Sequence, residues 1–110
     1  MQETIAENCP VIETIELLGG RYKLLILRAL LYAGTPLRFG KLKREIPEIS
    51  QKTLTRSLRD MEGAGLLKRT AYAEVPPRVE YALTPAGEEL MPVFLAMKAW
   101  REGHLGVRLD

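Results

Sequence analysis

The residues of this sequence whose types and spacing could do chemistry are concentrated in the stretch EISQKTLTRSLRDMEGAGLLKR, residues 48–69. A helical period of about 100° per residue places Leu54, Leu58 and Met61 on one stripe and a row of cations on the opposite side. The cations are Lys52, Arg56 and Arg59. Such a row suits binding to phosphates and base edges, whereas covalent catalysis needs a nucleophile with a base. Because a row of cations alone is more often a solvated surface, the elements that position it decide between the two interpretations.

The polar side chains of this stretch predict a division of roles in DNA binding. Arginine can bridge guanine with two hydrogen bonds, glutamine can do the same for adenine, and threonine can contact a thymine methyl group or a phosphate. The predicted contacts on this helix are Ser50, Gln51, Lys52, Thr53, Thr55, Arg56 and Arg59, with Lys52 expected to hold a phosphate. Backbone contacts that set the register are predicted for Lys41, Lys43, Arg44, Lys68, Arg69 and Arg78.

The charge of the chain is distributed unevenly. Its net value of +2 conceals ten cations and two acids between Arg21 and Arg59, a balance of +8, which leaves −6 for the other residues. A basic middle between acidic ends is expected of a protein with a surface that binds a polyanion.

The first half of the chain predicts helices around one short strand. Apolar residues at helical spacing in VIETIELL predict a short helix behind Pro10 that stops at a pair of glycines. The stretch RYKLLILRALLYAG is apolar almost all round and predicts a central buried helix. TPLRF is long enough only for a strand stub. The stripe of Phe39, Leu42 and Ile46 predicts a second short helix, closed by Pro47 and basic on its exposed side.

The helix that carries the cations has end signals on both sides. Ser50 suits the N-cap, and Ile49 before it can pack on Leu54 as a hydrophobic staple. Gly65 can adopt the left-handed conformation that ends a helix, which would bring Leu66 against Met61. Two short helices joined by a tight turn predict a helix-turn-helix.

The remainder predicts a hairpin and a last helix. VEYALT alternates apolar and polar residues, which predicts a half-buried strand, and LLKRTAYA is its expected antiparallel partner. Thr84 is expected to cap the last helix, with Pro85 in its first turn and a kink at Pro92. An apolar face follows, formed by Leu90, Val93, Phe94, Met97 and Trp100, and we expect it to be divided between the monomer core and a dimer interface. The predicted fold is mainly α with a small β-hairpin: a winged helix-turn-helix with an added C-terminal dimerisation helix.

Length and composition exclude several other classes of protein. At 110 residues the chain predicts one domain, with an arm and first helix at 1–20, a DNA-binding core with wing at 21–83, and a C-terminal dimerisation helix and tail at 84–110. It contains no apolar run of membrane-spanning length, and its acidic start does not resemble a secretory signal, so a cytoplasmic protein is expected. With one cysteine and one histidine, we expect no disulfide framework, no metal site, no cofactor and no enzyme activity. His104 is expected to be a solvated surface residue.

Several motifs together resemble the HxlR family of bacterial transcriptional regulators. They are CPV, LLGGRYKLLIL, RFGKLKREIPEISQKTLTRSLRDMEGAGLLKR and YAEVPPRVEYALTPAGEEL, in that order and spacing, over roughly residues 9–100. Tyr22 departs from the tryptophan general in the family and is interpreted as a tolerated aromatic exchange in the core. The resemblance implies a dimeric regulator of double-stranded DNA, with the helix after Ser50 in the major groove and the hairpin as a wing. It also implies a redox or electrophile sensor at Cys9, since some members use a cysteine at the matching place.

Two interpretations remain open beside these. A winged helix can serve purely as a protein interaction module, although the +8 segment would then be unexplained. Cys9 fits the role of an unremarkable, partly buried residue about as well as that of a sensor. The helix dipole favours a thiolate at this position, while the charges of Glu7 and Glu13 oppose it.

Overall fold

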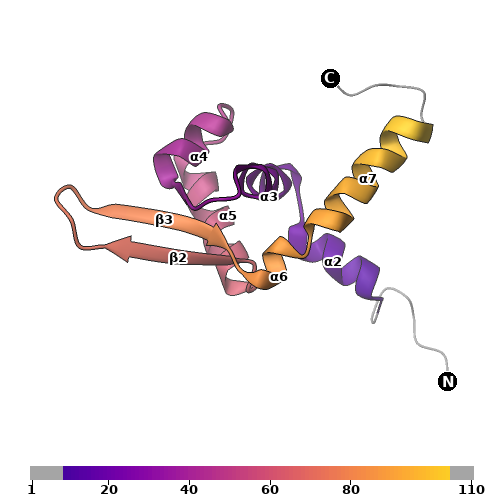
Figure 1. The fold of residues 1–110 in the computed structure, drawn as a ribbon, viewed down its shortest axis with the longest axis horizontal. Coiled ribbons are helices and arrows are strands. Elements are labelled where there is room, and N and C mark those ends of the chain that lie inside the picture. Colours follow the sequence, from indigo (N-terminus) through magenta and orange to yellow (C-terminus); the bar gives the residue numbers. More distant parts are fainter. Residues whose placement is uncertain (1–8, 105–110) are drawn as a thin grey trace.

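The computed structural model describes residues 9–104, so parts of the predicted N-terminal arm and C-terminal tail, residues 1–8 and 105–110, lie outside the described residues. The elements in chain order are α2 (Pro10–Leu18), α3 (Arg21–Ala33), β1 (Leu37–Arg38), α4 (Phe39–Glu45), α5 (Gln51–Gly63), β2 (Leu67–Tyr72), β3 (Arg78–Leu83), α6 (Pro85–Glu88) and α7 (Met91–His104). Figure 1 shows α3, α4 and α5 in the middle, the β2–β3 hairpin projecting at one end, and α2 and α7 diverging at the other. The predicted winged helix-turn-helix is confirmed.

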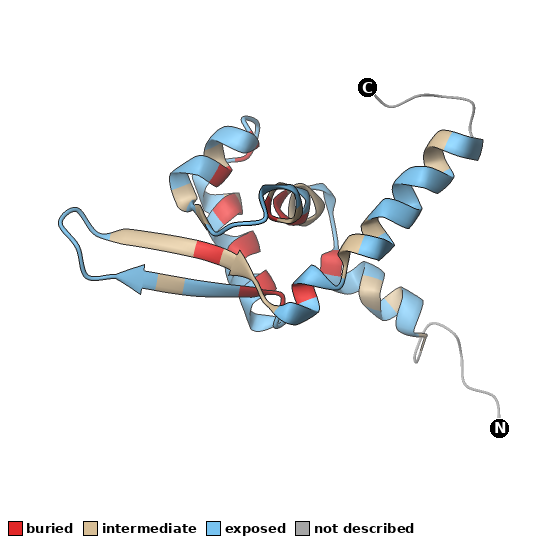
Figure 2. Ribbon diagram, viewed as in Figure 1, coloured by how far each residue is buried: buried red, intermediate tan, exposed pale blue. Residues whose placement is uncertain are grey.

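The core lies where α3, α4 and α5 pack against the base of the sheet. Its fully buried side chains are Ile26, Leu27, Leu30, Leu42, Ile49, Leu54, Leu58 and Met61. Tyr22 packs at the edge of this cluster, as the aromatic exchange requires. Buried positions are concentrated in the helix-turn-helix and α3, whereas α7 has none (Figure 2). The core of the described chain is therefore centred on α3 and the helix-turn-helix.

The sheet has three strands in the order β1-β3-β2, all antiparallel. The hairpin pairs Leu67 with Leu83 at its base and Tyr72 with Arg78 at its far end. The strand stub expected in TPLRF is β1, which pairs Leu37 with Tyr81 along the other edge of β3. This pairing fastens the wing to the segment just before α4, because Tyr81 is buried and Leu37 packs on the core.

The C-terminal helix differs from the prediction, which placed a kink at Pro92 inside one helix. The structure has two helices, and Pro92 lies in the first turn of α7, where its missing N–H costs no hydrogen bond. The break precedes the proline, at Glu89 and Leu90. α6 packs closely on the end of α5, since a Cβ at Gly87 would collide with the carbonyl oxygen of Leu66.

Within the described range, no helix combines the length and the apolar character needed to cross a membrane.

Candidate nucleic-acid interface

Helix α5 is fixed at both ends by hydrogen bonds that the sequence predicts. The hydroxyl of Ser50 accepts from the N–H of Thr53 at 3.0 Å and caps the helix. At the other end Gly65 has φ 82°. The N–H of Leu66 donates to the carbonyl of Met61 at 3.0 Å, and that of Gly65 donates to Glu62 at 3.0 Å, which is the Schellman arrangement. The orientation of α5 is thus determined by its own caps and by its buried stripe.

The exposed side of α5 brings most of the predicted contacts into one shallow surface. Gln51, Lys52, Thr55, Arg56 and Arg59 line it together. Among the described residues, none of its three cations makes an ion pair. Cations without a carboxylate partner can accept phosphates at little cost, so we name these five residues the α5 face.

Two predicted contacts on α5 lie apart from the α5 face. Thr53 is half-buried, and its hydroxyl oxygen accepts a hydrogen bond from the Ser50 hydroxyl at 3.0 Å. Both side chains are therefore engaged in the helix cap, although Ser50 remains exposed. Thr55 is the threonine that the structure places beside Gln51 and Arg56.

Helix α4 and β1 form a second basic groove beside the sheet. Arg38, Lys41 and Arg44 line it, together with Glu80 of β3. Lys41 forms an ion pair with Glu45 at 3.3 Å, while Arg44 is exposed and forms none within residues 9–104. Arg38 was not among the predicted contacts. The excess of cations between Arg21 and Arg59 included it, but only the pairing of β1 with β3 shows that it joins this groove.

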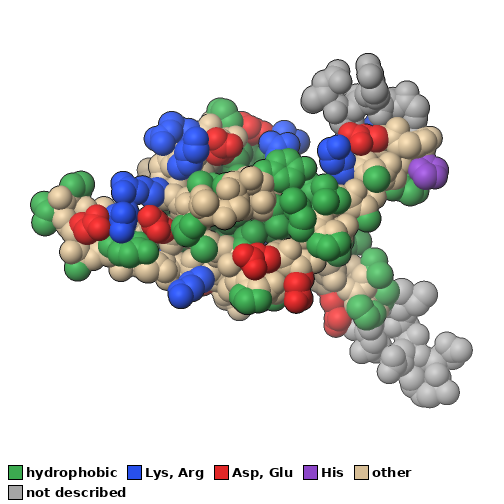
Figure 3. All heavy atoms as spheres, in the orientation of Figure 1, with side chains coloured by type: hydrophobic (Ala, Val, Ile, Leu, Met, Phe, Trp, Pro, Cys, Tyr) green, Lys and Arg blue, Asp and Glu red, His purple; other side chains and the backbone are tan. Residues whose placement is uncertain are grey.

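The wing presents its three predicted cations in different environments. Arg69 lines a groove together with Thr55, Arg59 and Glu62, and so extends the α5 face toward the hairpin. Lys68 is exposed on the neighbouring rung. Arg78 is half-buried and paired with two carboxylates, and acidic and basic side chains lie next to each other on the wing in Figure 3.

Comparison with known proteins identifies this arrangement. A model of the HxlR-like helix-turn-helix family matches residues 17–108. The chain belongs to the HxlR-like family. The transcriptional regulator YtfH of Escherichia coli is 44% identical over 100 residues, which cover 91% of this chain and 78% of that one.

Two solved regulators, the redox regulator HypR and the transcriptional regulator YodB, share the fold of this chain. The oxidised form of HypR has a TM-score of 0.78 at 37% identity, covering 93% of this chain and all of that one. The reduced form of YodB from B. subtilis has a TM-score of 0.78 at 36% identity, covering 89% of this chain and 95% of that one. The HxlR-like chain is thus a helix-turn-helix regulator that binds DNA, and its expected family, fold and general function are confirmed.

Outside the DNA-binding unit, this HxlR-like chain exposes apolar side chains on α2 and α7. On α7, Val93, Met97 and Trp100 share one face, and the last two are 50% and 56% exposed. Phe94 is instead half-buried, and its ring meets the exposed ring of Tyr32 on α3 edge to face, with 5.9 Å between the ring centroids. The other large apolar side chains exposed on the two helices are Leu95 on α7 and Val11, Ile15 and Leu17 on α2. Leu90 packs against the core, whereas Val93, Met97 and Trp100 are exposed. The dimer contacts expected of these exposed side chains stay a prediction.

Cys9 is the N-cap residue of α2 and is half-buried. Its carbonyl accepts the N–H of Glu13 at 3.0 Å, and its side chain makes no capping hydrogen bond. His104 is exposed as expected, with its ring stacked on Trp100 and its Nδ1 3.0 Å from the Trp100 carbonyl oxygen.

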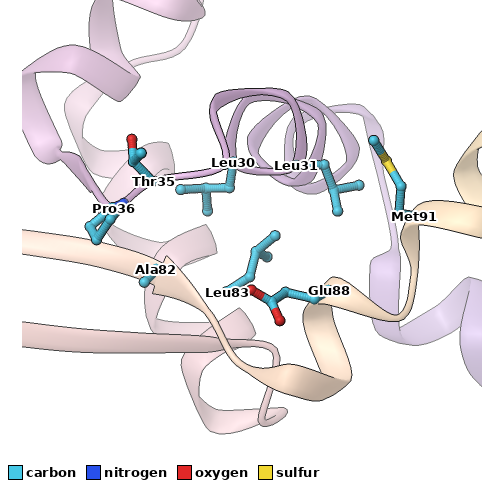
Figure 4. Close-up of a pocket in the computed structure, with 9 residues that line it drawn as sticks. Leu30, Leu31, Thr35, Pro36, Ala82, Leu83, Glu88 and Met91 are labelled. Atoms are coloured by element: carbon cyan, nitrogen blue, oxygen red, sulfur yellow. The ribbon is translucent and has the colours of Figure 1, made fainter.

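A hollow of about 240 Å³ lies beneath the junction of α6 and α7 (Figure 4). Leu30, Leu83 and Met91 contribute apolar walls, and Glu88 is the one ionisable residue that lines it. Its volume is below the roughly 300–1,000 Å³ typical of small-molecule pockets.

Proposed function

We propose that this protein regulates transcription as a homodimer on an inverted-repeat operator, with α5 of each subunit in a major groove. The α5 face supports this proposal most directly. Leu54, Leu58 and Met61 hold one side of the helix in the core, and the opposite side offers three cations without ion pairs among the described residues. A helix fixed on one side and cationic on the other suits insertion into a groove lined by phosphates.

Different residues of this surface suit the reading of base edges and the binding of backbone phosphates. Gln51 and Arg56 belong to the first half of α5, the part that lies nearest to base edges in helix-turn-helix proteins, and both can make two hydrogen bonds to one base. Lys43 and Arg44 on α4, and Lys68 and Arg69 on the wing, suit phosphates on either side. We assign base reading to the first pair and register to the others.

The apolar faces of α2 and α7 support a homodimer. Half-exposed Met97 and Trp100 would leave a large apolar area in water if the subunit were alone. A second copy of the chain offers the same face, and self-complementary packing gives two-fold symmetry. The operator should then be an inverted repeat whose half-sites lie one helical turn, about 34 Å, or a multiple of it apart.

HypR is described as a redox regulator, and YodB was solved in a reduced form. The similarity of this chain to both proteins supports a redox response at Cys9. A sulfenic acid at this position would need a thiol to resolve it, either a small thiol or the cysteine of the second subunit. A disulfide between subunits requires Cα atoms within about 7 Å of each other. Capping or bridging would alter the angle between the two subunits and with it the spacing of the two α5 helices.

The proposal places the protein in the cytoplasm with the chromosome and gives it no catalytic role. Selection of preferred sequences from a random pool of duplex DNA tests it. The expected result is an enriched inverted repeat with defined half-site spacing. Binding to all duplexes with equal affinity, or to none, would leave a protein interaction module as the better interpretation.

A further inference from the structure

The wing contains an arginine held by three neighbours. Arg78 is the first residue of β3 and pairs with Tyr72, the last residue of β2, on the rung next to the loop 73–77. Its guanidinium carbon lies 3.9 Å from the centre of the Tyr72 ring. Its Nη2 lies 3.1 Å from Oε2 of Glu74, and its Nε lies 3.7 Å from Oε2 of Glu80. The guanidinium group therefore closes the far end of the hairpin.

This environment separates Arg78 from the other predicted DNA contacts. Lys52, Arg56, Arg59 and Arg69 are exposed and make no ion pair within the described residues. The side chain of Arg78 is only 24% exposed and faces two carboxylates. One cation with two carboxylates carries a local charge of −1, so this end of the wing does not attract phosphate while the pairs are intact.

We propose that Glu74 competes with DNA phosphate for Arg78 and thereby limits the affinity of the wing for arbitrary DNA. The inference rests on the proposed function, since it gives Glu74 the role of limiting the affinity of the same DNA interface. A guanidinium group binds carboxylate and phosphate with the same paired geometry, so the two anions exclude each other at one face of the group. Glu74 is a positioning residue, because it acts through Arg78.

The two carboxylates differ in how readily they can be displaced. The Glu74 side chain is 48% exposed and lies in the loop, so water solvates it as soon as it leaves Arg78. Glu80 is 22% exposed, belongs to the central strand and also borders the groove of Arg38, Lys41 and Arg44. A phosphate would therefore replace Glu74, whereas Glu80 and the Tyr72 ring would keep the arginine aligned.

The test is a titration of the full chain with a random-sequence duplex over a series of salt concentrations. Glu74→Gln should bind more tightly than wild type at low salt, because Arg78 is free to take a phosphate. The slope of log K against log salt should steepen by up to about 0.9, the value of one added phosphate contact. The advantage over wild type should then shrink roughly three- to fourfold between 50 and 200 mM salt.

Glu102→Gln is a matched control. Glu102 forms the same kind of i,i+4 ion pair with Lys98, at 3.0 Å, on α7 at the end of the molecule remote from the wing (Figure 1). This variant makes the same change of net charge and frees a lysine, but it should leave both the affinity and the slope unchanged. An equal gain in both variants would show that net charge alone is responsible, and would overturn the proposal.

A second background shows whether Glu74 acts through Arg78. Arg78→Gln removes the charge while retaining a planar group over Tyr72, so the hairpin is less disturbed than by alanine. In this background Glu74→Gln should no longer steepen the slope, and a steepening that persists would mean direct repulsion between Glu74 and DNA. If wild type binds the duplex and Glu74→Gln matches it in affinity and slope, this inference alone fails. If wild type does not bind duplex DNA at any salt, the proposed function fails as well.

Discussion

The hydroxyl group of Thr84 donates a hydrogen bond to the carbonyl oxygen of Gly65 at 2.6 Å, although nineteen positions separate the two residues. The same hydroxyl oxygen accepts the N–H of Gly87 at 3.1 Å and so caps α6. The N–H of Thr84 donates to the carbonyl of Leu66 at 3.0 Å. One residue thus joins the end of α5, the end of the wing and the start of the C-terminal helices.

Thr84→Val should lower the free energy of unfolding by about 1–3 kcal/mol, because the variant keeps the shape of the side chain but loses a cap and a tertiary hydrogen bond. Chemical denaturation measures the difference. Thr35→Val is the control, since Thr35 is exposed and makes no side-chain hydrogen bond with the described residues. Equal losses for the two variants would show that the hydrogen bonds of Thr84 contribute nothing specific.

Base-specific contacts and phosphate contacts should be separable by mutation. Arg56→Ala should cost on the order of 1–3 kcal/mol on the selected operator and relax the preference at one base pair. Arg44→Ala should weaken binding to all sequences alike and reduce the salt slope by about one contact. Competition binding with single-base operator variants distinguishes the two effects. An Arg56→Ala variant with the same loss on operator and random DNA would mean that this arginine holds a phosphate.

The dimer interface should depend on one face of α7. Met97→Glu with Trp100→Glu places two charges on that face and should convert the protein to monomers, as measured by sedimentation. Leu95→Glu is the matched control, because Leu95 is 44% exposed on the opposite side of the helix and should leave the dimer intact. A folded dimer of the double variant would locate the interface elsewhere.

An ion pair between α3 and the turn of the helix-turn-helix should make stability depend on pH. Arg21 donates to Oε2 of Glu48 through Nη2 at 3.0 Å and through Nε at 3.3 Å, and this contact lowers the pKa of Glu48 below its ordinary 4.5. A lowered pKa contributes stability above the ordinary value, and the contribution is lost as pH falls through the pKa of the folded state. Glu48→Gln should therefore be less stable than wild type at pH 7 and equal to it in strong acid.

The matched background for that measurement is Arg21→Gln, in which Glu48→Gln should make no difference at either pH. A loss that persists in this background would assign the effect to the turn itself. Because both side chains are largely exposed, added salt should reduce the wild-type advantage at pH 7.

Local signals made α5 and its face predictable from the sequence. Ser50, Gly65 and the stripe of Leu54, Leu58 and Met61 lie within one short segment, so neighbouring residues determine both the ends of the helix and its buried side. Arg38 was not predicted as a DNA contact, because its place in the groove depends on the pairing of β1 with β3, which joins residues far apart in the chain.

The environment of Arg78 and the break before α7 also required the folded chain. Glu74 and Glu80 flank Arg78 in the sequence, but their contacts with it depend on the shape of the hairpin. Likewise, Gly87 reads as an ordinary helical residue until α6 is seen against the carbonyl of Leu66. The first feature depends on the geometry of the hairpin and the second on a tertiary contact, and the periodic patterns of the sequence encode neither.

Oxidation at Cys9 should change operator affinity in wild type and leave Cys9→Ser unchanged. Cys9 is half-buried and is the N-cap residue of α2, a helix that belongs to the proposed dimer interface. A new group on its sulfur would therefore alter how the two subunits pack. Operator binding is measured for both proteins before and after treatment with peroxide, hypochlorite or a quinone, and mass spectrometry establishes the modification. Non-reducing electrophoresis separates a bridge between subunits from a capped monomer. Wild type that carries a modified Cys9 and binds the operator with unchanged affinity would show that the cysteine is not a sensor.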